Sequence, residues 1–209
     1  MGTGGPRSGA ASGDTRAALL DAAKTCLLEQ GYGQLSTRSV TDAAGVPLSQ
    51  IHYHFGSRRG LVLALLEAEN ARLLARQSQM YGSDAPLWKR WEQACDFLDD
   101  DLDSGYVRVL QEMTAAGWSD DEVAAAVRAN LDGWFALLTG VFTELEQRTG
   151  DVGPFDPQEA AILAGAAFLG AEQLILLGLT EEAVPVRRAL RRVGEMLRRA
   201  EDRADGRTP

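Results

Sequence analysis

Apolar residues recur with a helical period along most of the chain. The first such segment covers residues 14–28. Leu20, Ala23 and Leu27 recur within it at i, i+3 and i+7, which is the spacing of one helix face. No segment alternates apolar and polar residues between hairpin turns, as a surface strand does. The pattern therefore predicts an all-α fold of about nine helices.

Capping and helix-breaking residues divide this pattern into elements. Ser36 caps a short second helix and Gly45 ends it. Pro47 suits the first turn of the third helix, because a proline there loses no helical hydrogen bond. The helices predicted after the first cover residues 37–44, 47–55, 57–79, 87–103, 105–116, 119–148, 157–177 and 184–203.

The same punctuation predicts two folded domains between two tails. A small helical domain is expected at residues 14–60 and a larger one at 61–203. Residues 1–13 are rich in Gly, Ser and Ala, and we expect them to be disordered. The last residues, 204–209, are expected to be disordered as well.

The three short helices before residue 60 have the order of a helix-turn-helix. A glycine-containing turn joins the second helix to the third, and Gly45 can take a positive φ there. The small pair Ala43-Ala44 allows close helix approach. In such motifs the last helix enters the DNA major groove. The sequence therefore predicts a DNA-binding domain.

The third helix has a face suited to that groove. Ile51 and Phe55, with Leu48 nearby, form its apolar stripe. The opposite face carries Ser49, Gln50, His52 and Tyr53. These uncharged polar side chains can hydrogen-bond base edges and phosphates, whereas an ordinary surface helix carries Glu, Lys and Arg.

The distribution of charge permits a nucleic-acid partner. The net charge of −9 argues at first against one. Residues 1–60 nevertheless carry six basic and four acidic side chains, whereas residues 61–209 carry 15 basic and 26 acidic ones. The mildly positive segment 1–60 can approach phosphate, while the acidic segment 61–209 is repelled by it. Because the excess is small, we expect DNA affinity to depend on specific contacts and on dimerisation.

Residues 16–66 resemble the N-terminal domain of the tetracycline-repressor-type (TetR) family. The matching pieces, in order, are Ala22-Ala23, Gly31-Tyr32, Ser36-Thr37-Arg38-Ser39-Val40, Ala43-Ala44-Gly45-Val46, Tyr53-His54-Phe55 and Ser57-Arg58. The resemblance covers about a quarter of the chain. It implies a homodimer whose two heads read a pseudo-palindromic operator in double-stranded DNA.

The resemblance also implies which residues touch DNA. The implied base contacts are Thr37, Arg38, Leu48, Ser49 and Gln50. The implied phosphate contacts are Tyr53, His54 and Arg58. Gln50 stands where many members have a small residue, so base readout is expected to be particular to this chain. His52 departs from the usual apolar residue and is kept as a candidate DNA contact without an assigned role.

Several of these residues have a second interpretation. Tyr53 can be a packing aromatic, Arg38 a solvated charge, and Arg59 either a phosphate contact or a surface charge. His52 and His54 are the only histidines. They diverge by about 200° around a helix and cannot chelate one ion. We therefore expect no metal and no cofactor.

The larger domain carries aromatic residues at helical spacing. Core packing explains such residues, but the TetR family holds an effector pocket between these middle helices. The candidate lining residues are Trp91, Cys95, Leu98, Met113, Trp118, Trp134, Leu138, Phe168 and Glu172. Glu172 lies in an apolar helix, so it is expected to be ion-paired within the protein or dimer, or to contact an effector.

The last two predicted helices are expected to form the dimer interface. An apolar stripe of Val186, Leu190, Val193 and Leu197 suits a four-helix arrangement made with residues 157–177 of both subunits. The arginines beside the stripe have an alternative role as a second DNA-binding surface. Residues 160–179 nearly suffice to cross a membrane, but Glu172 and Gln173 within them favour burial in protein.

Other chemistry is weakly indicated. The run Asp99-Asp100-Asp101 is expected to be a solvated face, and Cys26 and Cys95 are expected to be reduced, buried thiols. No nucleophile–base pair, phosphate loop or Glu-x-x-His motif favours an enzyme. No secretory leader is recognised.

The sequence thus predicts a cytoplasmic repressor released from DNA by a small-molecule effector. The alternative is a DNA-binding regulator controlled by a protein partner.

Overall fold

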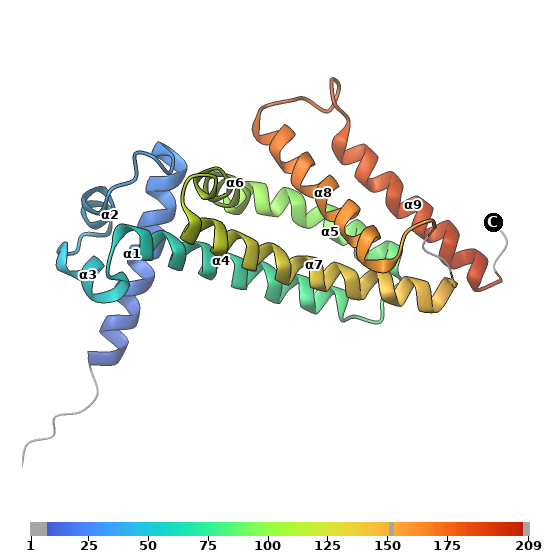
Figure 1. The fold of residues 1–209 in the computed structure, drawn as a ribbon, viewed down its shortest axis with the longest axis horizontal. Helices are drawn as coiled ribbons and strands as arrows, with labels where there is room; N and C mark the ends of the chain where they lie inside the picture. Colours follow the sequence, from blue (N-terminus) through green and yellow to red (C-terminus); the bar gives the residue numbers. More distant parts are fainter. Residues whose placement is uncertain (1–7, 151–152, 207–209) are drawn as a thin grey trace, which may run out of the picture. The chain divides into compact units, whose positions relative to one another are not determined.

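The chain forms an all-helical structure, as predicted. The computed structural model describes residues 8–150 and 153–206, and these contain nine helices and no strand (Figure 1). The helices are α1 (Ser8–Gln30), α2 (Thr37–Ala44), α3 (Ser49–Phe55), α4 (Arg58–Tyr81), α5 (Leu87–Asp103), α6 (Tyr106–Gly117), α7 (Asp121–Thr149), α8 (Pro157–Leu176) and α9 (Val186–Ala204).

The helices form two compact units. The first extends to Glu69 and also includes Val109–Val127, and the second consists of Asn70–Arg108 and Arg128–Pro209. The first unit therefore holds α1 to α3, the beginning of α4, most of α6 and the beginning of α7. It is compact in space but assembled from two separate stretches of sequence.

In the first unit, α1 packs against α2 and α3. The predicted α1 stripe of Leu20, Ala23 and Leu27 is buried, as are Val40 of α2 and Ile51 of α3. Such side chains hold the short helices in place, because α2 and α3 are too short to be stable in isolation.

Local signals place the ends of α2 as predicted. Ser36 has extended backbone geometry and accepts a hydrogen bond from the Ser39 N–H, while Ser39 accepts one from the Ser36 N–H. Gly45 ends the helix with φ +66°, a left-handed conformation that favours glycine. The turn into α3 is therefore fixed by local chemistry.

The start of α1 corrects the predicted tail. The helix begins at Ser8 rather than Asp14, so it includes residues 8–13 of the segment that the sequence predicts to be a tail. Extending an existing helix costs far less than nucleating one, and Ala10 and Ala11 have high helix propensity. Residues 1–7 and 207–209 lie outside the described part of the chain.

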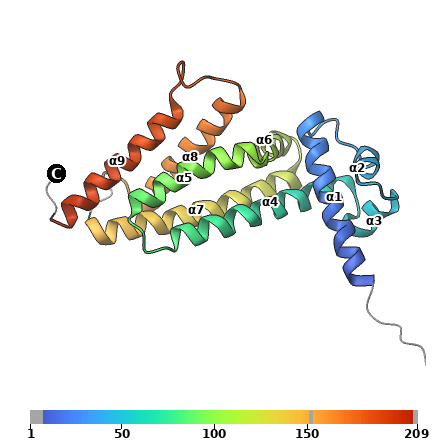
Figure 2. The same cartoon turned by 180° about the vertical axis from the view of Figure 1, so that it is seen from behind.

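In the second unit, α5, α8 and α9 pack against one another, and Figure 2 shows these helices from the opposite side. Gly165 lets α8 approach α7, because a Cβ there would lie 2.4 Å from the Phe135 ring. The α5 residue Trp91 packs on Phe168 of α8, with ring centroids 5.3 Å apart. Aromatic side chains from successive helices thus fill this unit's core.

Candidate nucleic-acid interface and core cavity

The start of α2 and the outward side of α3 present the residues predicted to touch bases. Thr37 and Arg38 occupy the first turn of α2, and Arg38 is exposed. Leu48 is 44% exposed just before α3, Ser49 is exposed, and Gln50 is half-buried. These five residues therefore flank the turn at Gly45 from both sides.

The rest of α3 separates into inward and outward residues. His52 and Tyr53 are exposed, and Tyr53 is 74% exposed. The His54 ring packs between Tyr53 and Phe55, with centroid distances of 4.8 and 5.9 Å. The His54 Nε2 is buried without a hydrogen-bond partner. His54 thus packs against its two neighbouring rings, and the phosphate contact that the resemblance implies for it stays a prediction.

Arg58 holds the loop between α1 and α2. Its Nε donates to the Leu35 carbonyl oxygen at 2.6 Å, and its Nη2 donates to the Tyr32 carbonyl oxygen. Its guanidinium lies 4.6 Å from the centre of the Tyr32 ring. This arrangement differs from the implied phosphate contact, because the guanidinium is engaged within its own unit. The loop that it holds leads directly into the Ser36 cap of α2.

Glu112 of α6 holds the same loop from another element. Its Oε2 accepts a hydrogen bond from the Tyr32 N–H at 3.1 Å. The sequence offers no signal for this contact, since the two residues are 80 positions apart. The Tyr32 backbone is therefore fixed at its N–H by α6 and at its carbonyl by α4.

Arg59 is neutralised by the segment that follows α6. Its guanidinium forms ion pairs with Asp120 at 3.1 Å and Glu122 at 3.0 Å. The Glu122 hydrogen bond and the Asp120 charge raise the pKa of Arg59. These ion pairs favour neither of the two roles weighed for Arg59, since they occupy its charge within the unit.

The folded unit is less positive than its N-terminal sequence. Across both of its stretches the unit carries six basic and ten acidic residues. Lys24 is paired with the buried Glu69 at 2.6 Å. Among the described residues of this unit, Arg16 and Arg38 are the exposed cations without a carboxylate partner. Few charges thus remain available to phosphate.

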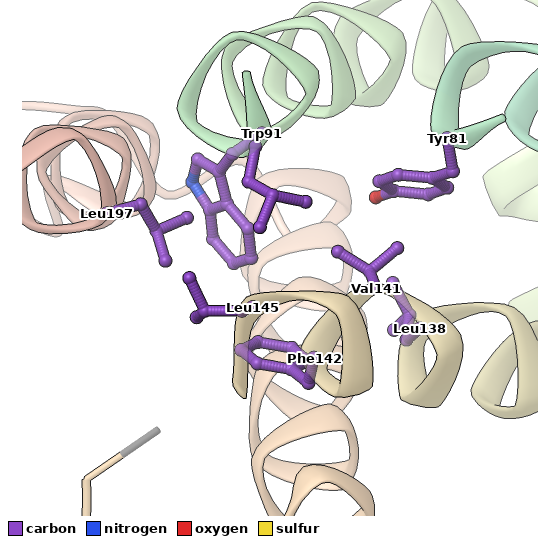
Figure 3. A pocket seen from close by; sticks show the side chains of 8 residues that line it. Tyr81, Trp91, Leu138, Val141, Phe142, Leu145 and Leu197 are labelled. Atoms are coloured by element: carbon purple, nitrogen blue, oxygen red, sulfur yellow. The ribbon is translucent and has the colours of Figure 1, made fainter. Parts of the chain in front are cut away.

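The core of the second unit contains a small apolar cavity (Figure 3). Its lining residues are Tyr81, Leu87, Trp91, Leu138, Val141, Phe142, Leu145 and Leu197. Its volume is about 10 Å³, the space of roughly one water molecule. As Figure 3 shows, rings and leucines from several helices converge on it. An effector therefore needs side chains to move before it can enter.

Some of the predicted pocket residues lie in this core. Trp91 and Leu138 line the cavity. Cys95, Leu98, Trp134 and Phe168 belong to the surrounding core, and Glu172 is buried on α8. The lining residues that sequence reasoning missed include Phe142 and Leu145, although their i, i+4 and i+7 spacing from Leu138 marks one face of α7.

Two predicted pocket residues are placed elsewhere. Trp118 is 83% exposed at the end of α6, and it belongs to the first unit. Met113 is buried in the first unit. Neither residue lies in the core of the second unit, where the small cavity is found, so their role in an effector pocket stays a prediction. Periodicity alone does not reveal that placement.

The indole N–H groups of this core are hydrogen-bonded to other residues of the same unit. The Trp91 indole donates to the Leu190 carbonyl oxygen at 2.7 Å, and the Trp134 indole donates to Gln77 at 2.8 Å. Cys26 and Cys95 are free and buried, as predicted. Burial raises the pKa of the Cys95 thiol to about 11, so it stays protonated at neutral pH.

A buried arginine connects three segments of this unit. Arg90 is 3% exposed and binds Glu144 of α7 through two nitrogens, at 2.7 and 2.6 Å. It also donates to the carbonyl oxygens of Tyr81 and Ala85. The Arg90 hydrogen bond lowers the pKa of Glu144. The guanidinium thereby fastens the α4–α5 connection to α7.

The aspartate run of α5 binds arginines. Asp99 accepts from Arg187 of α9 at 2.7 Å, and Asp101 accepts from Arg76 of α4 at 2.5 Å. Its carboxylates thus join helices, in contrast to the expected solvated face. Within the described residues there is no cluster of three or more His, Cys, Asp or Glu side chains arranged to hold a metal.

The α8 helix exposes a large apolar face. Ile162 and Leu163 are about half exposed, next to the exposed Ala166 and Ala167. Within the described residues, α8 alone is long and apolar enough to cross a membrane, with 28% of its most apolar stretch buried. Met196 of α9 is exposed as well. The face is larger than isolated surface apolar residues would make it.

Comparison with known proteins identifies the N-terminal part of the chain. Residues 19–65 match the family described as bacterial regulatory proteins, tetR family. The repressor AcnR of Corynebacterium glutamicum is 34% identical over 60 residues, which are 29% of this chain and 32% of that protein. AcnR of Corynebacterium efficiens is 33% identical over 66 residues, 32% of this chain and 35% of that protein. The chain thus spans about a third of the curated relatives it matches.

Solved structures share the fold over most of the chain. A TetR-family transcriptional regulator from Rhodococcus sp. has a TM-score of 0.76 at 23% identity, covering 88% of this chain and 98% of that one. A regulator from Saccharomonospora viridis in complex with choline has a TM-score of 0.74 at 19% identity, covering 85% and 94%. FadR from Bacillus subtilis with stearoyl-CoA has a TM-score of 0.71 at 18% identity, covering 87% and 96%. Residues 19–65 therefore match the tetR family of bacterial regulatory proteins, and the solved structures show the same fold over most of the chain.

Proposed function

We propose that the protein is a sequence-specific transcriptional repressor that binds a pseudo-palindromic DNA operator as a homodimer. The carrying observation is the uncharged outward side of α3, held beside the first turn of α2 by the Gly45 turn. The implied base contacts, Thr37, Arg38, Leu48, Ser49 and Gln50, gather there, flanked by His52 and Tyr53. The matched relatives are repressors. A cytoplasmic, non-enzymatic protein fits this role.

The exposed apolar face of α8 supports the homodimer. A second copy that presents the same face would cover Ile162 and Leu163, and closed two-fold pairing is the commonest oligomer geometry. The interface would consist of residues 157–177 and 184–203 from both subunits. Two heads per dimer also compensate for the few available cations on each head.

DNA binding is tested by gel shift on the DNA upstream of the gene. We expect a sequence-specific band at moderate salt that is lost on Arg38→Ala. The control is Arg188→Ala, which removes an exposed arginine of α9. Loss of binding by a control that sedimentation shows to be dimeric would favour the second DNA-binding surface. A dimeric wild type without any specific band contradicts the proposal.

Regulation by a small-molecule effector is the favoured mechanism. Solved structures of similar fold are complexes with choline and stearoyl-CoA, and the apolar core around Trp91 and Phe142 is the candidate effector site in this chain. The ligand would favour a dimer whose two recognition helices no longer match the operator spacing. A thermal-shift screen of small apolar and amphipathic compounds tests it, with Phe142→Ala as a variant of enlarged cavity.

Control by a protein partner is the second candidate. The small volume of the cavity favours it, because the core around it is filled by its own side chains. This candidate predicts that no compound stabilises the wild type, even where the same compound stabilises Phe142→Ala. A compound that stabilises the wild type and weakens its operator binding would exclude it.

A further inference from the structure

Leu48 contributes little to the stability of the fold. Its backbone is helical, with φ −56° and ψ −30°, and its side chain makes no capping hydrogen bond at the start of α3. Ser, Thr, Asp or Asn is preferred at such a position because its side chain can bind a free N–H. Leu48 instead presents an apolar side chain that is 44% exposed. Neither capping nor core packing accounts for a leucine here.

The helix that follows Leu48 carries few charged side chains. No residue of Ser49–Phe55 is acidic, and its only basic residues are His52 and His54. Leu48, Tyr53 and Trp118 are the exposed large hydrophobics among the described residues of the first unit, and the first two lie at α3. Arg58 and Arg59 are occupied by partners within the unit. This side of α3 thus offers mainly apolar and neutral hydrogen-bonding contacts.

We infer that Leu48 determines part of the operator sequence by packing on the 5-methyl group of a thymine. The inference rests on the proposed function. The thymine methyl is the apolar group that base pairs display in the major groove, so it is the chemical complement of an exposed leucine. Gln50, two residues further on, has the amide that pairs with an adenine edge. Together they select a half-site that contains A·T pairs.

The test begins by selecting operators from a randomised duplex pool with the wild-type protein. Each conserved thymine of the selected half-site is then replaced by uracil, which removes only the methyl group. At one thymine we expect affinity to fall about fourfold per half-site, the effect of losing one buried methyl. Replacement in both half-sites is expected to lower affinity about fifteenfold.

Leu48→Ala should bind the thymine and uracil operators equally, because it lacks the packing partner. Leu48→Met keeps the side-chain volume and should still discriminate. Trp118→Ala removes another exposed apolar residue of the same unit, and it should discriminate like the wild type. Thermal melts confirm that each variant is folded.

The outcomes separate this inference from the proposed function. A wild type that selects a specific duplex but ignores every thymine methyl overturns the role of Leu48 and leaves the repressor intact. Continued discrimination by Leu48→Ala also overturns it, because another residue would then read the methyl. A wild type that selects no duplex overturns both.

Discussion

The Glu112 carboxylate accepts a hydrogen bond from the Tyr32 N–H at 3.1 Å, and this joins α6 to the loop in front of α2. Glu112→Ala should lower the free energy of unfolding by about 1 kcal/mol, since a part-buried N–H loses its acceptor. Glu112→Gln keeps an acceptor and should lose less. Urea unfolding measures both variants, and amide exchange at Tyr32 should accelerate in the alanine variant. Unchanged exchange there would contradict this role.

DNA binding should depend only moderately on salt. Arg16 and Arg38 are the exposed cations of each protomer without a carboxylate partner, so a dimer brings about four positive charges to DNA, which predicts a slope of log affinity against log salt of about −4. Arg38→Ala should reduce the slope by about 2 in magnitude, for two lost contacts. Arg59→Ala should leave it nearly unchanged, because Asp120 and Glu122 already neutralise Arg59. A wild-type slope steeper than about −8 would mean that many more cations contact phosphate.

Two glycines of α8 should respond in opposite ways to alanine. Gly165→Ala places a Cβ 2.4 Å from the Phe135 ring and should destabilise the protein by roughly 1–3 kcal/mol. A Cβ at Gly170 would meet no atom within 4 Å, so Gly170→Ala should be neutral or stabilising by up to about 1 kcal/mol. Thermal and urea unfolding of both variants check this. Equal effects would contradict the close approach of α8 and α7.

The ion pair between Arg90 and Glu144 should contribute to stability only above acid pH. The pKa of Glu144 lies below its ordinary value of 4.5 when folded, so the contribution is present above that pH and is lost as pH falls further. At pH 7, Glu144→Gln should cost roughly 1–2 kcal/mol, a value reduced because Glu144 is partly exposed.

Urea unfolding at pH 7 and pH 3.5 measures that contribution. The difference between wild type and Glu144→Gln should narrow at the lower pH. Glu146→Gln, an exposed neighbour on the same helix, serves as the control and should show little effect at either pH. A difference that stays constant would assign the stability to something other than the charge on Glu144.

A charge placed on the exposed face of α8 should dissociate the proposed dimer. Leu163 is 52% exposed in one chain, and Leu163→Asp would put a carboxylate at the centre of the contact. Sedimentation should then report a folded monomer with weaker operator binding. Trp118→Glu, in the other unit, should remain dimeric. A dimeric Leu163→Asp variant would move the interface elsewhere.

The elements that the sequence predicts best are those fixed by local chemistry. Ser36 and Gly45 place the ends of α2 because capping and a positive φ depend on near neighbours. The third helix begins at Ser49, two residues after the predicted start at Pro47, which lies outside the helix. The contacts of Arg58 are harder to predict from sequence, because its carbonyl partners lie in a loop more than 20 positions away. The exposure of Trp118 could not be predicted, because helical spacing does not show where the chain leaves the core.

The first unit is built from two stretches of sequence, and this limits how its DNA-binding helices can be exchanged between proteins. Because Val109–Val127 belongs to the same compact body as α1 to α3, a chimera that takes only the first 69 residues leaves behind Glu112, Asp120 and Glu122. The Tyr32 N–H would lose its acceptor, and Arg59 would recover a charge that the native head does not display. A hybrid repressor with a new operator preference therefore has to contain residues 1–69 and 109–127 from the same protein. Otherwise the charge of its DNA-binding unit will differ from that of both parent proteins.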